Sequence, residues 1–80
     1  FNPQTTIQFA LPEASQLRIE VMNVLGQRIA VLSDQAMAAG FHMVRWDGRT
    51  TSREKASSGM YFCRLQAKSF NKTIKMMLLP

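Results

Sequence analysis

The sequence predicts an all-β fold, a small antiparallel β-sandwich of six to seven strands. Two observations carry this prediction. Apolar and polar residues alternate with a period of two through several short runs, as they do in strands that bury one face. These runs recur roughly every ten residues and are separated by Gly, Pro, Asn and Ser, which is the spacing typical of a sandwich.

The length of the chain limits it to one domain. At 80 residues it should bury only about 60% of its unfolded surface, so its core is small. Its hydrophobic content of 46% is typical of a folded protein and excludes a disordered segment. The chain starts FNPQTT, without an initiator methionine, and we interpret residues 1–80 as one domain cut from a longer polypeptide.

The first two alternating runs are the clearest strands. In TTIQFALP, a strand that Pro12 ends, one face carries Ile7, Phe9 and Leu11. In QLRIEVMNV, Arg18 and Glu20 face away from Leu17, Ile19 and Val21. A helix would spread these charges around its circumference, whereas a strand segregates them, so we predict a strand.

A hairpin should connect the second run to the third, RIAVL. The linking segment NVLGQ contains Asn23 and Gly26, residue types that tolerate a positive φ. The following segment, SDQAMAAG, is the one place where a helix competes, since Ser33 could cap it and Gly40 could end it. About two turns would be marginal, so we predict a loop or a short helical turn there.

Three further runs complete the predicted sheet. In FHMVRWDG, the inner face should be the one that carries His42, Val44 and Trp46. In GMYFCRLQA, alternation sets Tyr61, Cys63 and Leu65 against Met60, Phe62 and Arg64. In KTIKMMLL, it sets Ile74, Met76 and Leu78 against Lys75, Met77 and Leu79. The last two runs are apolar enough to be covered on both faces or to expose a patch for a partner.

The residues that catalysis requires are scarce. The single histidine, His42, shares a face with Trp46, and the single cysteine, Cys63, lies inside a strand, so both are expected to be structural. One His and one Cys cannot form a tetrahedral zinc site. The five acidic residues stand alone in the sequence, and the glycines form no phosphate-binding loop. We therefore expect no enzyme, no metal and no cofactor.

The basic residues do not point to a nucleic acid. Ten Lys and Arg against five Asp and Glu give a net charge of +5, but the basic residues are dispersed singly, with no interleaved aromatics. We expect a solvated basic surface. No run approaches the ~20 apolar residues that cross a bilayer, and no signal-peptide pattern opens the chain, so we expect no stable membrane insertion.

Several short motifs are informative in combination. They are Asn2-Pro3 before the first strand, the segment Asn23-Val24-Leu25-Gly26-Gln27, Gly40, Trp46-Asp47-Gly48, and Gly59-Met60-Tyr61. With the basic, apolar last run, they resemble the C-terminal sorting domains (type A) of the type IX secretion system along essentially the whole chain. The same pattern is similar to the immunoglobulin-like module of the flagellar hook-capping family.

The resemblance implies an immunoglobulin-like sandwich fused behind a secreted enzyme or adhesin of a bacterium of the Bacteroidetes or a neighbouring group. The domain would act as a C-terminal secretion signal that the outer-membrane translocon recognises and that a surface sortase removes. The protein would pass through the periplasm to the cell surface or the medium, and the domain would be a monomer.

The recognition site implied by this resemblance lies in the last run. Relatives often end on a basic residue, whereas this chain ends Leu78-Leu79-Pro80, so Lys75 is the nearest basic candidate. The candidate recognition residues are Lys72, Lys75, Met76, Met77, Leu78 and Leu79. If this strand lies at a sheet edge, its main-chain groups offer a docking site for an added strand.

An alternative function is an accessory sandwich that spaces, stabilises or binds carbohydrate for an attached enzyme. Its candidate ligand-binding residues are the aromatic side chains Phe41, Phe62 and Phe70. A carbohydrate site usually needs two or three aromatic rings on one surface. Whether these rings share a surface therefore separates the two hypotheses.

Overall fold

The structure, a computed structural model, describes residues 5–79 and contains six β-strands. The first three are β1 (Thr5–Leu11), β2 (Ser15–Met22) and β3 (Arg28–Met37). The others are β4 (Gly40–Trp46), β5 (Gly59–Gln66) and β6 (Asn71–Leu78). All pairings are antiparallel, which confirms the predicted all-β sandwich.

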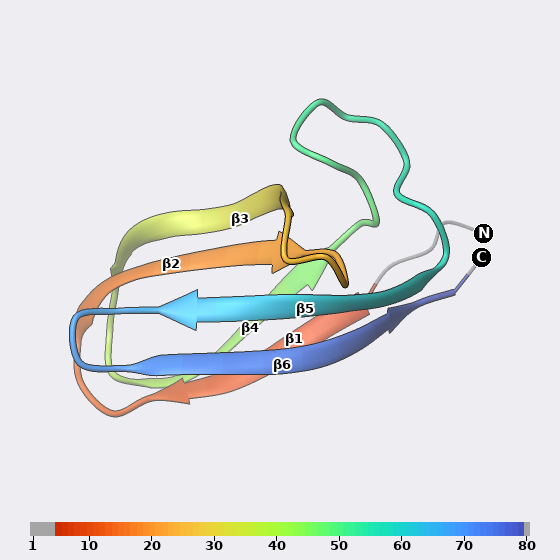
Figure 1. The fold of residues 1–80 in the computed structure, drawn as a ribbon. Coiled ribbons are helices and arrows are strands. Elements are labelled where there is room, and N and C mark those ends of the chain that lie inside the picture. Colours follow the sequence, from red (N-terminus) through yellow and green to blue (C-terminus); the bar gives the residue numbers. More distant parts are fainter. Residues whose placement is uncertain (1–4, 80) are drawn as a thin grey trace.

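The strands form two sheets that lie face to face (Figure 1). One sheet contains β1 and β4, and the other has the order β3-β2-β5-β6. In the second sheet β2 and β5 are central, whereas β3 and β6 have a neighbouring strand on one side only. Among the described residues, β6 therefore lies at a sheet edge, which is the condition for the addition of another strand.

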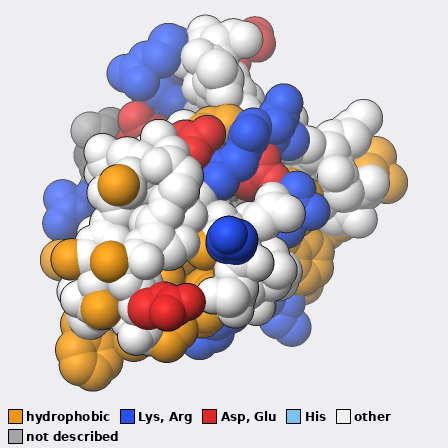
Figure 2. Space-filling view, turned by 90° about the vertical axis from the view of Figure 1, so that its left-hand side faces the viewer, with side chains coloured by type: hydrophobic (Ala, Val, Ile, Leu, Met, Phe, Trp, Pro, Cys, Tyr) orange, Lys and Arg blue, Asp and Glu red, His pale blue; other side chains and the backbone are white. Residues whose placement is uncertain are grey.

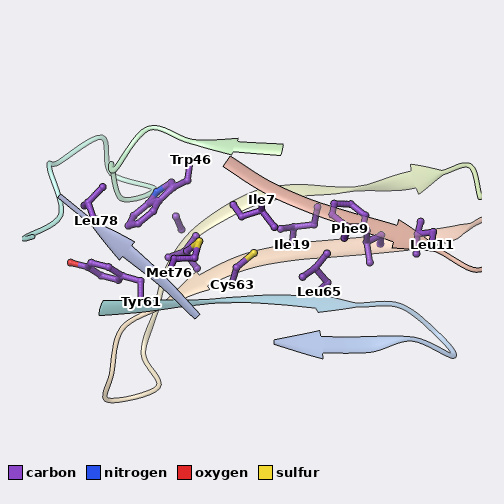
Figure 3. Close-up of a cluster of buried hydrophobic side chains, with 13 residues drawn as sticks. Ile7, Phe9, Leu11, Ile19, Trp46, Tyr61, Cys63, Leu65, Met76 and Leu78 are labelled. Carbon is purple, nitrogen blue, oxygen red and sulfur yellow. The ribbon is translucent and has the colours of Figure 1, made fainter. Parts of the chain in front are cut away.

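The core lies between the sheets and follows the predicted alternation. Figure 3 shows the side chains of Ile7, Phe9 and Leu11 on β1 directed toward the inner face of β2 and β5. Trp46 and Tyr61 meet at one end of this core, with ring centroids 5.0 Å apart in an edge-to-face arrangement. The buried residues of the other strands follow the same alternation: Leu17, Ile19, Val21, Trp46, Tyr61, Cys63, Leu65, Met76 and Leu78. His42 and Val44, predicted on the inner face with Trp46, are only half-buried, as is Ile74.

The predicted hairpin joins β2 and β3. Gly26 has a φ of +82°, and its amide donates to the carbonyl of Asn23 over 3.0 Å. The Asn23 side chain accepts hydrogen bonds from the amides of Leu25 and Gln27. Gly26 thus supplies the positive φ of the turn, and the Asn23 side chain supplies its hydrogen-bond acceptor.

The prediction of a loop or short helical turn over SDQAMAAG is wrong for its first half. Residues 33–37 continue β3, and their pairing with β2 extends as far as Ser15 opposite Met37. Two irregularities in the register of β2 and β3 accommodate the long strand. Hydrogen bonding to a central strand outweighs the helix propensity of a few alanines, because that propensity is worth only tenths of a kcal/mol per residue.

Trp46→Ala tests the packing between the sheets. The indole is fully buried against Tyr61, so its truncation should lower the free energy of unfolding by about 3–5 kcal/mol in urea denaturation. The matched control is Phe41→Ala on the same strand, where the ring is 92% exposed and the loss should stay below about 0.5 kcal/mol. Equal losses would contradict the assigned inner face of β4.

Candidate functional site

The long segment between β4 and β5 is held by the two aromatic residues at its ends. The indole Nε1 of Trp46 donates to the carbonyl of Arg49 over 2.9 Å, and the Tyr61 hydroxyl donates to the carbonyl of Ser57 over 2.6 Å. Both donors belong to side chains of the core. The motifs around Trp46 and Tyr61 therefore anchor this connection to the sandwich.

The segment also satisfies its own backbone. Arg49 and Lys55 form an isolated antiparallel bridge, and the Arg53 amide donates to the carbonyl of Thr50. Asp47, the acidic residue of the WDG motif, accepts a hydrogen bond from the amide of Arg49, as an Asx turn requires. The buried Gly48 has a φ of +77°, which explains why glycine stands there. The polar residues of this segment therefore build a turn.

The other potentially reactive side chains are also structural. Within residues 5–79, no three His, Cys, Asp or Glu side chains gather as a metal site would require. His42 stacks on Phe9 and makes a 2.7 Å hydrogen bond with the carbonyl oxygen of Ala38. Cys63 is fully buried, and burial raises the pKa of its thiol to about 11, so little nucleophilic thiolate forms near neutral pH.

The last strand, β6, divides its residues between core and surface. Met76 and Leu78 are buried, whereas Lys72, Lys75, Met77 and Leu79 are exposed. A partner that meets the folded domain can therefore touch only the latter four of the six side chains predicted for recognition. Lys72 lies at the start of the strand, away from the other three.

The exposed face of β6 continues onto β5. Met77 lies opposite Met60, and both side chains are exposed, while Lys75 lies opposite the half-buried Phe62. We call the exposed side chains of Met60, Lys75, Met77 and Leu79, together with the open edge of β6, the β6 surface. This surface combines apolar contact area, one positive charge and main-chain groups that have no strand partner within residues 5–79.

The remaining motif residues that the structure describes lie in strands or turns. Gly40 begins β4 and Gly59 begins β5. Leu25 is 80% exposed at the tip of the β2–β3 turn, so it is not a core residue. Asn2 and Pro3 lie outside the described residues.

The aromatic side chains proposed for carbohydrate binding do not form a platform. Phe41 is exposed on β4, beside a hollow of about 450 Å³ that Gln8, Ala10 and Met43 also line. Phe62 and Phe70 are half-buried, and Phe62 belongs to the other sheet. Figure 2, which views the end of the molecule where β3 connects to β4, shows the exposed hydrophobic side chains mainly toward the lower left.

The structure contains one charged cluster that the sequence did not predict. Glu20 is only 1% exposed, yet it lies on the outer face of the four-stranded sheet under three arginines. Its Oε1 accepts hydrogen bonds from Nε and NH2 of Arg64 at 3.0 and 2.5 Å. Its Oε2 accepts from Nε of Arg18 at 3.1 Å and from NH1 of Arg28 at 3.3 Å. We call Glu20, Arg18, Arg28 and Arg64 the arginine cluster.

The arginines keep Glu20 ionised despite its burial. Desolvation alone would raise the pKa of the carboxyl group, but hydrogen bonds from Arg64 and Arg28 and the charges of Arg64 and Arg18 outweigh it. The net result is a pKa below the ordinary value of 4.5. The buried charge is therefore fully paired at neutral pH.

Glu20→Gln tests this cluster through the pH dependence of stability. At about pH 7 the variant should lose roughly 1–3 kcal/mol of unfolding free energy in urea, because an amide cannot pair with three cations. The lowered pKa of Glu20 implies stability that is present above pH 4.5 and is lost as the pH falls through the folded-state value. The wild type and the variant should thus converge in strong acid, and a constant difference across the pH range would contradict the pairing.

Comparison with known proteins identifies the family. A solved structure of FlgD from P. aeruginosa shares the fold, with a TM-score of 0.75 and 22% sequence identity over 94% of this chain. The chain spans 58% of the length of that FlgD chain. No curated protein matches the sequence. The model of the family described as the FlgD Ig-like domain matches residues 2–70, a segment that ends just before β6. The chain therefore belongs to the FlgD Ig-like domain family.

Proposed function

We propose that this domain is a C-terminal secretion signal that carries an attached enzyme or adhesin through the type IX outer-membrane translocon. The observation that carries the proposal is the β6 surface. It joins an open strand edge to exposed apolar side chains and Lys75, next to a stable core. Family membership supports the immunoglobulin-like framework, and the motifs at both ends of the β4–β5 connection match those of sorting domains.

Recognition would proceed by strand addition. The outward-facing main-chain groups of β6 have no strand neighbour within the described residues, so an extended segment of the translocon can pair with them. Lys75, Met77 and Leu79 would then provide side-chain specificity next to the added strand. Met76 and Leu78 hold β6 in register with the core, so the signal exists only in the folded domain.

The remaining steps of the proposal follow from the role of a secretion signal. The attached cargo would lie N-terminal to residue 1 and cross the periplasm to the cell surface or the medium, where a sortase would remove the signal. The domain would act as a monomer, without catalysis or a cofactor. The structural roles of His42, Cys63 and Asp47 agree with this function.

A second candidate is an accessory module that binds a ligand for its attached enzyme. The exposed Phe41 and the hollow beside it favour this function, because a sugar ring can stack on one uncovered aromatic side chain. The absence of a second exposed ring among Phe62 and Phe70 counts against polysaccharide binding. A titration with polysaccharides in which Phe41→Ala abolishes the binding heat would favour this candidate over the secretion signal.

The secretion signal is tested by export of a reporter. Residues 1–80 are fused behind a reporter with an inner-membrane export signal, in a host that contains a type IX system. The wild-type fusion should reach the cell surface or the medium, and Lys75→Glu combined with Met77→Asp should reduce export roughly tenfold or more. The blocked reporter should accumulate in the periplasm.

The control for this experiment is a matched pair of exposed residues. Lys68→Glu with Met43→Asp makes the same chemical changes outside the β6 surface, because Lys68 lies in the β5–β6 turn and Met43 on β4. The two methionines are similarly exposed, 64% for Met43 and 54% for Met77. This variant should be exported like the wild type, and urea denaturation should show both variants folded. A wild-type fusion retained in the periplasm, or equal export of both variants, would overturn the proposal.

A further inference from the structure

The arginine cluster contains more positive charge than its buried carboxylate can neutralise. One arginine would suffice to pair with Glu20, but three guanidinium groups share its two oxygen atoms. Because all three contact one carboxylate, they lie within a few ångströms of one another. Among residues 5–79, the acidic groups that offset their mutual repulsion are Glu20 and the partly exposed Asp34, whose Oδ2 is 3.9 Å from Arg18.

We propose that the arginine cluster is a binding site for a phosphate group, either free or in the headgroup of an anionic lipid. This inference does not rest on the proposed secretion function, because it concerns a different part of the sheet. The four hydrogen bonds to Glu20 use up the acceptor capacity of its carboxylate. The remaining N–H donors of the arginines have no acceptor in the part of the chain that the structure describes.

The arrangement favours phosphate for two reasons. The side chains of Arg18, Arg28 and Arg64 are 38%, 55% and 43% exposed, so each contacts Glu20 with one edge and faces solvent with another. Glu20 thereby fixes the direction of the free donors before a ligand arrives, which lowers the entropic cost of binding. A tetrahedral dianion can accept from several guanidinium groups at once, and its charge equals the two positive charges that the three arginines leave after Glu20.

The position of the cluster allows either source of phosphate. It lies on the open outer face of the four-stranded sheet and not in an enclosed cavity, so a phosphate displayed on a membrane can reach it as easily as a free ion. Lys75, which lies across β5 on the same face, extends the positive charge toward the sheet edge. Figure 2 shows Lys and Arg side chains grouped with acidic ones in the upper part of that view.

Titration with inorganic phosphate, followed by NMR of the arginine Nε–H groups, tests the site in the whole domain. The signals of Arg18, Arg28 and Arg64 should shift together, and added salt should weaken the binding. Arg28→Gln is the variant of choice, because Arg28 is the most exposed of the three and its 3.3 Å bond to Glu20 is the longest. It should raise the dissociation constant for phosphate roughly tenfold while the domain stays folded.

The control is Arg45→Gln, which removes an exposed arginine from the other sheet. It should leave phosphate binding unchanged.

A second experiment measures cosedimentation of the domain with vesicles of phosphatidylglycerol and of phosphatidylcholine. If the domain binds the anionic vesicles and Arg28→Gln weakens this binding, the site is assigned to lipid headgroups. If the domain binds inorganic phosphate but not the vesicles, the site is assigned to the free ion. Unshifted arginine signals, or equal weakening by Arg28→Gln and Arg45→Gln, would overturn the proposal.

Export of the reporter distinguishes this inference from the secretion function. Arg28 lies on β3, at the opposite edge of the sheet from β6, so Arg28→Gln should be exported normally even though it binds phosphate weakly.

Discussion

The packing of the β1–β4 pair against the four-stranded sheet is the constraint on which the rest of the molecule depends. No main-chain ladder joins the two sheets among the described residues, so the strands of one sheet meet those of the other through side-chain packing. An isolated pair of strands is at best marginally stable, and β1 and β4 persist because Ile7, Phe9 and Trp46 bury their apolar area against the larger sheet. The same Trp46 also fixes the β4–β5 connection through its indole nitrogen. Core packing and the conformation of the β4–β5 connection thus both depend on Trp46.

This dependence extends to the last strand. The inner residues Met76 and Leu78 complete the core near Trp46 and Tyr61 (Figure 3), and the outer residues of the same strand remain available to a partner. Loss of core packing would release β6 and destroy its exposed edge. In the proposed secretion function, such a signal would report that the domain has folded, which an unstructured tail could not do. The arginine cluster lies on the outer face of the same sheet, as do the exposed residues of β6.

The alternation of residues predicted the strands and their buried faces, since side-chain direction in a strand depends only on position along the chain. The end of β3 could not be predicted, because residues 33–37 have weak local preferences and become a strand only by pairing with β2.

The arginine cluster could not be predicted from the sequence for a similar reason. Glu20 and Arg64 are 44 residues apart in sequence and meet only because β2 pairs with β5. The dispersal of basic residues along a sequence does not show how they are distributed over a folded sheet.

Amide hydrogen exchange of the native domain tests most directly the claim that β6 is a stable strand with one open edge. The amides of β2 and β5 should exchange only through global unfolding, because these strands are central. Along β6, every second amide should be protected by β5, and the intervening amides should exchange almost as fast as in an unfolded chain. Uniform protection along β6 would mean that its edge is already covered, and uniform fast exchange would mean that the strand does not persist. Either result would contradict the account.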